Sequence, residues 1–231
     1  MSLTRSDLES LRLQQMIAVE KLGLSILSTA ELEASIAQIL QQKPPQSDVW
    51  IFAYGSLIWN PILKYCDRIS GKIYGWHRSF CLRTPVGRGT PENPGLVLAL
   101  ESGGSCRGIA YRIAPELIAP ELLLLWRREM VVGSYIPRWV KVFAVGTSID
   151  AIVFTINPKH PMYDPKLSIE AVATTIATAE GALGSCSDYL SQTIYGLAEH
   201  QIIDRGLLNL QKQVTEINSV QQQSESSQSC A

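Results

Sequence analysis

The stretch Val49-Trp50-Ile51-Phe52-Ala53-Tyr54-Gly55-Ser56-Leu57 decides how this chain folds. Its first six residues are all apolar or aromatic, and most of them are β-branched or bulky, which favours a fully buried strand. The run breaks at Gly55-Ser56, where a strand tip leaves backbone N–H groups unpaired and glycine lets a ligand approach the main chain. The stretch therefore predicts either a cradle for a small anion, such as a carboxylate, or an ordinary strand-ending turn.

The composition predicts a globular protein with a sizeable core. Of the 231 residues, 46% are hydrophobic and the net charge is -1, without a basic or acidic block. This balance excludes binding to nucleic acid or to a membrane surface through bulk charge. No apolar run approaches the ~20 residues of a membrane span, and the N-terminus lacks a signal-peptide core. We expect a soluble cytoplasmic protein.

The cysteines and histidines carry no metal-site pattern. The five cysteines are an odd number without C-x-x-C spacing, and the three histidines are far apart. Cysteines of this kind are typical of reduced thiols in a reducing compartment. We expect no metal and no cofactor.

Residues 1–47 are predicted to form a helical N-terminal extension. Apolar residues between 8 and 22 favour one amphipathic helix that stops at Gly23, and Ser28-x-x-Glu31 is a capping box that begins another. A Pro44-Pro45 loop separates this extension from the strand at Val49. We expect the extension to serve packing or self-association, for example in a homodimer, and to contribute no site residue.

The sequence pattern from Val49 to Phe154 is typical of a β-barrel. Short apolar runs alternate with glycine turns, and hairpins are predicted around 102–105 and 146–148. Many short strands with such turns indicate a small, curled barrel. The loop 85–95 is rich in proline and glycine, but no helix follows it and no Lys-Ser/Thr closes it, so it is not a phosphate loop.

One helix interrupts the β region and carries a carboxylate on its apolar face. It begins near Pro120 and runs to Met130. Helical spacing places four residues on one face: Leu122, Leu125, Trp126 and Glu129. Arg128 is rotated by about 100° and Arg127 by about 200°, so both basic neighbours should point elsewhere. The pKa of Glu129 should then rise, as a proton shuttle requires; alternatively, Glu129 lies at the edge of the stripe and reaches water or an arginine.

Helices return after Phe154. The patterns predict one helix over 168–179, a second from Ser187 or Asp188, and a short third over 202–210. The chain thus divides into the extension, a domain over 48–212 and a Gln/Ser-rich tail over 213–231, which we expect to be disordered.

Several motifs together resemble the ChaC-type γ-glutamylcyclotransferases. They follow one another in the family's order over about residues 50–210, and they are Trp50–Pro61, Gly75–Cys81, Gly87–Thr90, Leu125–Met130, Gly133–Tyr135 and Asp188–Leu190. The resemblance implies an α+β fold with a small mixed β-barrel and flanking helices. It also implies cleavage of glutathione to 5-oxoproline and cysteinylglycine, without a cofactor.

The resemblance also implies roles for individual residues. Glu129 falls at the catalytic glutamate, and the substrate-binding loop falls at Tyr54, Gly55, Ser56 and Leu57. Tyr135 and Tyr189 fall at tyrosines that line the pocket, and Arg88 is a candidate for contacting a substrate carboxylate. The motif Trp50–Pro61 has Ala53 where the family often has glycine.

The residue types suit this chemistry, and alternatives remain open. The substrate's α-amine attacks its own γ-carbonyl, so a positioned base and N–H donors for the oxyanion are sufficient. A thiol mechanism through Cys81 and His77 is a rival, since Cys81 lies four residues after His77. Ser56 lacks the G-x-S-x-G elbow of acyl-enzyme serines. The same scaffold could also be a non-catalytic sensor of γ-glutamyl ligands.

Overall fold

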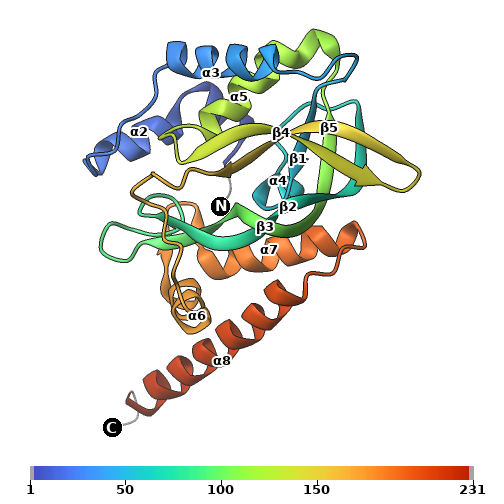
Figure 1. The fold of residues 1–231 in the computed structure, drawn as a ribbon. Coiled ribbons are helices and arrows are strands. Elements are labelled where there is room, and N and C mark those ends of the chain that lie inside the picture. The colour runs from blue at the N-terminus through green and yellow to red at the C-terminus, as the bar shows by residue number, and fades with distance from the viewer. Residues whose placement is uncertain (1–2, 229–231) are drawn as a thin grey trace.

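Five strands close into a barrel at the centre of the computed structural model, which describes residues 3–228 (Figure 1). Their order around the barrel is β1-β3-β2-β4-β5, and the parallel pairing of Ile51 with Ile152 closes it between β1 and β5. The strand bounds are β1 Trp50–Ala53, β2 Asp67–Thr84, β3 Gly95–Arg112, β4 Tyr135–Ala144 and β5 Thr147–Ile156. The predicted small mixed barrel is confirmed.

The apolar run that begins at Val49 lies in the centre of the core. Ile51, Phe52 and Ala53 are completely buried. The strand stops where the sequence predicts, because the helix α4 (Ser56–Trp59) begins directly after Gly55. A buried strand between two neighbours thus ends in a turn whose flanking residues Tyr54 and Leu57 still belong to the core.

One of the two predicted hairpins is wrong. β2 and β3 pair along their whole lengths, so the connecting turn is the loop 85–94 and not 102–105. Gly103 and Gly104 instead form a bulge opposite Gly75, with φ angles of 101° and 66°. Glycine tolerates the left-handed conformation that such a bulge requires. The second prediction is confirmed, since β4 and β5 form a hairpin through Val145-Gly146.

The N-terminal helices and α5 cover one side of the barrel (Figure 1). They are α1 Arg5–Glu9, α2 Arg12–Val19, α3 Thr29–Gln41 and α5 Ile118–Glu129, which follows the 3-10 turn Pro115–Leu117. The predicted capping box at Ser28 and Glu31 begins α3. Leu32, Ile36 and Ile39 of α3 belong to the main hydrophobic core.

The remaining helices lie on the opposite side of the barrel (Figure 1). They are α6 Ile169–Thr178, α7 Cys186–Glu199 and α8 Arg205–Gln228, with the two-stranded ribbon β6 Glu180–Gly181 and β7 Gly184–Ser185 between α6 and α7. Figure 1 shows α8 projecting away from the barrel toward the C-terminus.

The structure differs from the expected disordered tail over 213–231. The helix α8 continues to Gln228, and residues 229–231 lie outside the described part. Leu207 and Val214 are buried, and Leu210 and Ile217 pack on the core at helical spacing. Glutamine is a good helix former, so a helix anchored by these residues can propagate through the Gln-rich segment.

No helix within residues 3–228 is long and apolar enough to cross a membrane.

Candidate active site

A single cavity of about 200 Å³ gathers every site residue that the sequence predicts. It lies between the tip of β1, the C-terminal end of α5, the start of β4, the loop after β2 and the helix α7. The predicted residues that line it are Tyr54, Gly55, Ser56, Leu57, Arg88, Glu129, Tyr135 and Tyr189. These residues come from distant parts of the sequence, so the fold brings them together.

Glu129 is the last residue of α5, and its side chain is only 14% exposed. The apolar stripe that the sequence predicts is real, since Leu122, Leu125 and Trp126 are completely buried. Burial raises the pKa of Glu129, and the positive charge of Arg128 opposes part of that rise. Glu129 Oε1 is buried and makes no hydrogen bond within the described residues. This carboxyl therefore holds a proton more readily than an exposed glutamate does.

The expectation that both arginines point away from Glu129 is wrong for Arg128. Arg128 Nε lies 3.1 Å from Glu129 Oε1, a charge contact without hydrogen-bond alignment. Arg128 also donates from Nη1 to Asn60 O at 2.8 Å and from Nη2 to Ser56 Oγ at 2.8 Å. A rotation of about 100° between Cα positions does not separate the side chains, because the arginine stem is long enough to reach back. Arg128 thus links the catalytic candidate to the tip of β1.

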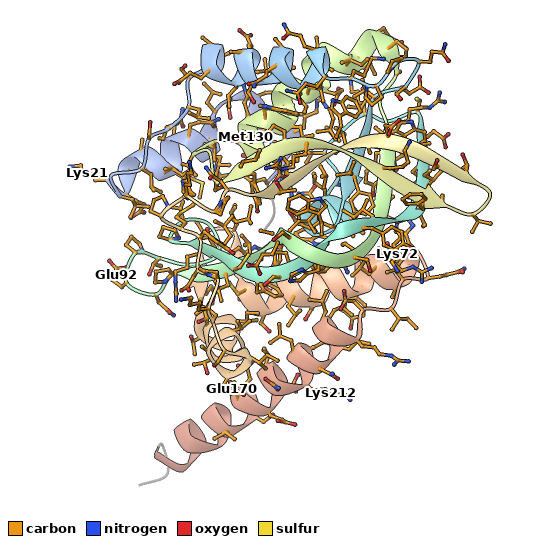
Figure 2. The ribbon with its side chains drawn as sticks, viewed as in Figure 1. Lys21, Lys72, Glu92, Met130, Glu170 and Lys212 are labelled. Carbon is orange, nitrogen blue, oxygen red and sulfur yellow. The ribbon has the colours of Figure 1, made fainter. Side chains whose placement is uncertain are left out.

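Figure 2 shows where the C-terminal end of α5 lies. Met130, the residue that follows Glu129, lies on the side of the barrel that carries the N-terminal helices.

At the tip of β1, the backbone of Gly55 passes close to the hydroxyl of Tyr189. A Cβ at Gly55 would lie 3.0 Å from Tyr189 Oη and 3.6 Å from Leu98 Cβ. Ser56 is the first residue of α4, and the first N–H groups of a helix have no acceptor within it. Glycine therefore keeps the backbone close to the tyrosine and leaves N–H groups available beside the cavity.

Three tyrosines surround Glu129: Tyr54 and Tyr189 are buried, and Tyr135 is half-buried. Tyr54 Oη donates to Phe154 O at 2.8 Å, and Tyr135 Oη donates to Leu98 O at 3.1 Å. Burial raises the pKa of both phenols well above the usual value and raises that of Tyr189 to about 12. All three hydroxyls therefore stay protonated and neutral near pH 7.

Arg88 places a buried guanidinium in the same cavity. The residue is 7% exposed, and its guanidinium carbon lies 5.9 Å from the Trp59 ring centre and 5.8 Å from that of Tyr189. Burial lowers the pKa of Arg88. Within the described residues it makes one hydrogen bond, from Nη1 to Ser185 O at 3.0 Å. Its remaining donors are available to an anion.

Two glycines hold the backbone that carries Arg88. A Cβ at Gly89 would lie 2.1 Å from Gly95 N, and a Cβ at Gly95 would lie 2.3 Å from Arg88 O. Cys186 Sγ also donates to Arg88 O at 3.1 Å. Gly89 and Gly95 thus serve close backbone packing.

The N-terminal extension contributes to the site, contrary to expectation. Four of its apolar residues line the cavity, namely Leu3, Leu13, Ile17 and Leu24. No pattern in the sequence indicates this contribution, because apolar residues that line a cavity follow the same helical period as residues that fill a core.

The rival thiol lies elsewhere. Neither Cys81 nor His77 lines the cavity, and burial raises the pKa of Cys81 to about 12. His77 Nδ1 lies 3.1 Å from Gly103 O, on the bulge. Since the reactive form of cysteine is the thiolate, Cys81 is unsuited to nucleophilic catalysis.

The described cysteines Cys66, Cys81, Cys106 and Cys186 are free thiols. Within residues 3–228, no cluster of histidine, cysteine, aspartate and glutamate could hold a metal ion.

Comparison with known proteins places this chain in a known family. The model of the family described as ChaC-like protein matches residues 49–217. The glutathione-specific γ-glutamylcyclotransferase of Escherichia coli K12 is 43% identical over 188 residues, which cover 80% of this chain and 81% of that protein. The human glutathione-specific γ-glutamylcyclotransferase 1 is 30% identical over 167 residues, which cover 70% of this chain and 75% of the human protein.

The fold has a counterpart among solved structures. The yeast γ-glutamyl cyclotransferase specific to glutathione superimposes with a TM-score of 0.67 at 23% identity, over 74% of this chain and 97% of the yeast chain. The family match and the relatives together establish that this chain belongs to the ChaC-like family.

Proposed function

We propose that this protein cleaves glutathione by cyclising its γ-glutamyl group, which releases 5-oxoproline and cysteinylglycine. The observation that carries the proposal is the buried Glu129 carboxyl in one cavity with the glycine-bearing tip of β1. The relatives named as glutathione-specific γ-glutamylcyclotransferases support the choice of substrate.

Glu129 is proposed to move the proton that the reaction requires. The substrate's α-amine arrives as an ammonium and becomes a nucleophile only after it loses a proton. The Glu129 carboxylate accepts that proton, and the amine nitrogen then attacks the γ-carbonyl carbon. When the amide bond to cysteine breaks, Glu129 returns this proton to the leaving nitrogen. The attacking nitrogen gives up a second proton as the lactam forms, and the cysteinylglycine amine takes up one proton to leave as an ammonium, so the protons balance. No water is consumed, and a raised pKa suits a group that must both accept and donate a proton.

Positioning of the γ-glutamyl unit contributes the other large part of the rate enhancement. Both reacting atoms belong to the same glutamyl unit, so a site that holds this unit folded back turns the attack into a favourable intramolecular step. Arg88 is proposed to bind the α-carboxylate, because its buried guanidinium keeps unused donors on the cavity side. Tyr135 and Tyr189 border the space that the folded unit would occupy.

The β1 tip is proposed to stabilise the oxyanion that develops on the γ-carbonyl oxygen. Backbone N–H groups of Gly55, Ser56 and Leu57 are the donors beside the cavity, and fixed N–H donors can stabilise such a charge. Arg128 adds positive charge there and holds Ser56 through its hydroxyl.

Product analysis tests this proposal. Purified protein is incubated with glutathione, γ-glutamylcysteine and γ-glutamylalanine, and 5-oxoproline is measured by mass spectrometry. We expect 5-oxoproline and cysteinylglycine in equal amounts from glutathione. Release of free glutamate would contradict cyclisation. Binding of glutathione without any product would favour a γ-glutamyl sensor on the same fold.

We further infer that residues 48–212 form the catalytic domain and that the protein acts in the cytoplasm. The free thiols among the described cysteines suit a reducing compartment. Assembly as a homodimer stays a prediction.

A further inference from the structure

The cavity has two chemically different ends. Glu129, Arg128 and Arg88 supply the charged groups of one part of the lining, while the fourth charged residue, Arg83, is paired with Asp164. The other end is lined by a small apolar cluster that is separate from the main core and is built around Leu13, Ile17, Val131 and Val132. A substrate with one ionic half therefore has a single orientation that avoids burying charge against apolar side chains.

Half of that apolar end comes from the N-terminal segment. Leu13 and Ile17 lie one helical turn apart on α2, so they present one face to the cavity. Val131 and Val132 follow α5 closely and belong to the same cluster as Leu13 and Ile17. Without residues 3–24, the cavity would lack this wall.

Hydrogen bonds fix residues 3–24 to the helix α5, which carries Glu129. Arg5 forms a two-pronged ion pair with Glu121 of α5, from Nη1 at 2.7 Å and from Nη2 at 2.9 Å. Glu121 is 1% exposed, and paired arginine and carboxylate groups of this geometry are among the stronger polar contacts. Gln14 Nε2 also donates to Arg127 O at 3.3 Å.

One further contact ties the segment to the site itself, and a second holds the chain that follows it. Asn60 Nδ2 donates to Leu3 O at 2.9 Å, while Asn60 O accepts from Arg128. Leu27 N donates to Val131 O at 2.9 Å, just beyond the segment. A wall held at both ends in this way is a fixed surface and suits selection among substrates.

We propose that residues 3–24 form a specificity wall, which receives the side chain of the residue joined to the γ-glutamyl group and favours a neutral, weakly polar one. This inference rests on the proposed function, because that function places the γ-glutamyl unit at the ionic end. The leaving dipeptide then points to Leu13 and Ile17. A thiol or an alkyl side chain fits this wall, whereas a hydroxyl loses its hydrogen bonds to water there.

The test compares three tripeptides that differ only at the second residue. They are glutathione, γ-glutamyl-2-aminobutyryl-glycine and γ-glutamyl-seryl-glycine. For the wild-type protein we expect kcat/KM to be about 10-fold higher for the aminobutyryl than for the seryl peptide. In Ile17→Asn this ratio should fall close to one. The matched control is Val19→Asn on the same helix, since Val19 is 74% exposed and outside this cavity; it should keep the wild-type ratio.

A second variant and a binding measurement distinguish failure of the specificity wall from failure of the proposed activity. If Ile17→Asn does not fold, Ile17→Ala should lower the ratio in the same direction by a smaller factor. Dissociation constants of the three peptides, measured by calorimetry, should give the same preference without turnover. Preference in binding without 5-oxoproline would overturn the proposed activity and retain the wall. An equal response of the wild-type protein to both peptides, or an unchanged ratio in the Ile17 variants, would overturn the wall.

Discussion

Glu129→Gln should lower kcat for 5-oxoproline release by about 10²–10⁴-fold, the usual contribution of a general acid–base group. Glutamine has nearly the same shape but cannot accept the ammonium proton. Because the variant retains the volume of the side chain in the cavity, its affinity for glutathione should stay close to that of the wild type. Initial rates and calorimetric titration with glutathione measure the two quantities separately.

The control for this variant is Glu116→Gln, since Glu116 is exposed in the turn before α5 and should leave the rate unchanged. A rate for Glu129→Gln near that of the control would remove Glu129 from the mechanism. Loss of both rate and affinity would instead assign Glu129 to substrate binding.

Thermal unfolding of Glu129→Gln tests whether the variant loses activity because it misfolds. At a pH below the ordinary glutamate pKa, Glu129 is protonated in both the folded and the unfolded wild type, so its titration does not change the free energy of unfolding. As the pH rises, the unfolded chain releases this proton first, because burial raises the pKa of Glu129 in the folded protein. Each unit of that rise lowers stability by about 1.4 kcal/mol once both states are ionised. Glutamine does not ionise, so the inactive variant should be the more stable protein at pH 8 and lose this advantage in acid.

Arg88→Met should raise the KM for glutathione by about 100-fold, because removing one partner of a buried charge pair costs about 3 kcal/mol. Methionine retains an apolar stem between Trp59 and Tyr189 but provides no donor for the α-carboxylate. The value of kcat at saturation should change much less, since proton transfer does not involve Arg88. Steady-state kinetics over a wide range of glutathione concentrations separates the two parameters.

Arg88→Lys tests whether charge alone is sufficient. The guanidinium binds Ser185 O while it faces two rings, and a lysine ammonium cannot reproduce this planar arrangement. We therefore expect only partial recovery of KM. The control is Arg68→Met, which removes an exposed arginine outside the cavity. If KM in Arg88→Met matches that of the control, the α-carboxylate is bound by another group.

Local patterns were sufficient to predict the elements that carry the proposed site residues. The buried strand before Gly55 and the stripe that ends at Glu129 each depend on residues that are close in sequence, and both have the predicted form. The hairpin around Gly103-Gly104 was mispredicted because a glycine pair serves a bulge inside a long strand as well as a turn. Only the pairing partner distinguishes the two.

Long-range contacts were beyond such patterns. The charge contact of Arg128 with Glu129 depends on how a long side chain bends around the end of α5. The cavity wall from Leu13 and Ile17 depends on how the N-terminal helices dock on α5 through the Arg5–Glu121 pair. The helical part of the Gln-rich tail depends on Val214 packing on the core. None of these contacts has a signature within one segment.

The most direct measurement of the central claim is the titration of the Glu129 carboxyl itself. It is followed by carbon NMR, with the signal assigned by its loss in Glu129→Gln, and compared with the pH dependence of kcat/KM for glutathione. Because the base must be deprotonated in the free enzyme, kcat/KM should fall as the pH drops through the Glu129 pKa. We predict one common midpoint, above the ordinary glutamate value of about 4.3. A carboxyl that titrates at or below that value, or a kinetic midpoint at a different pH, would contradict the account.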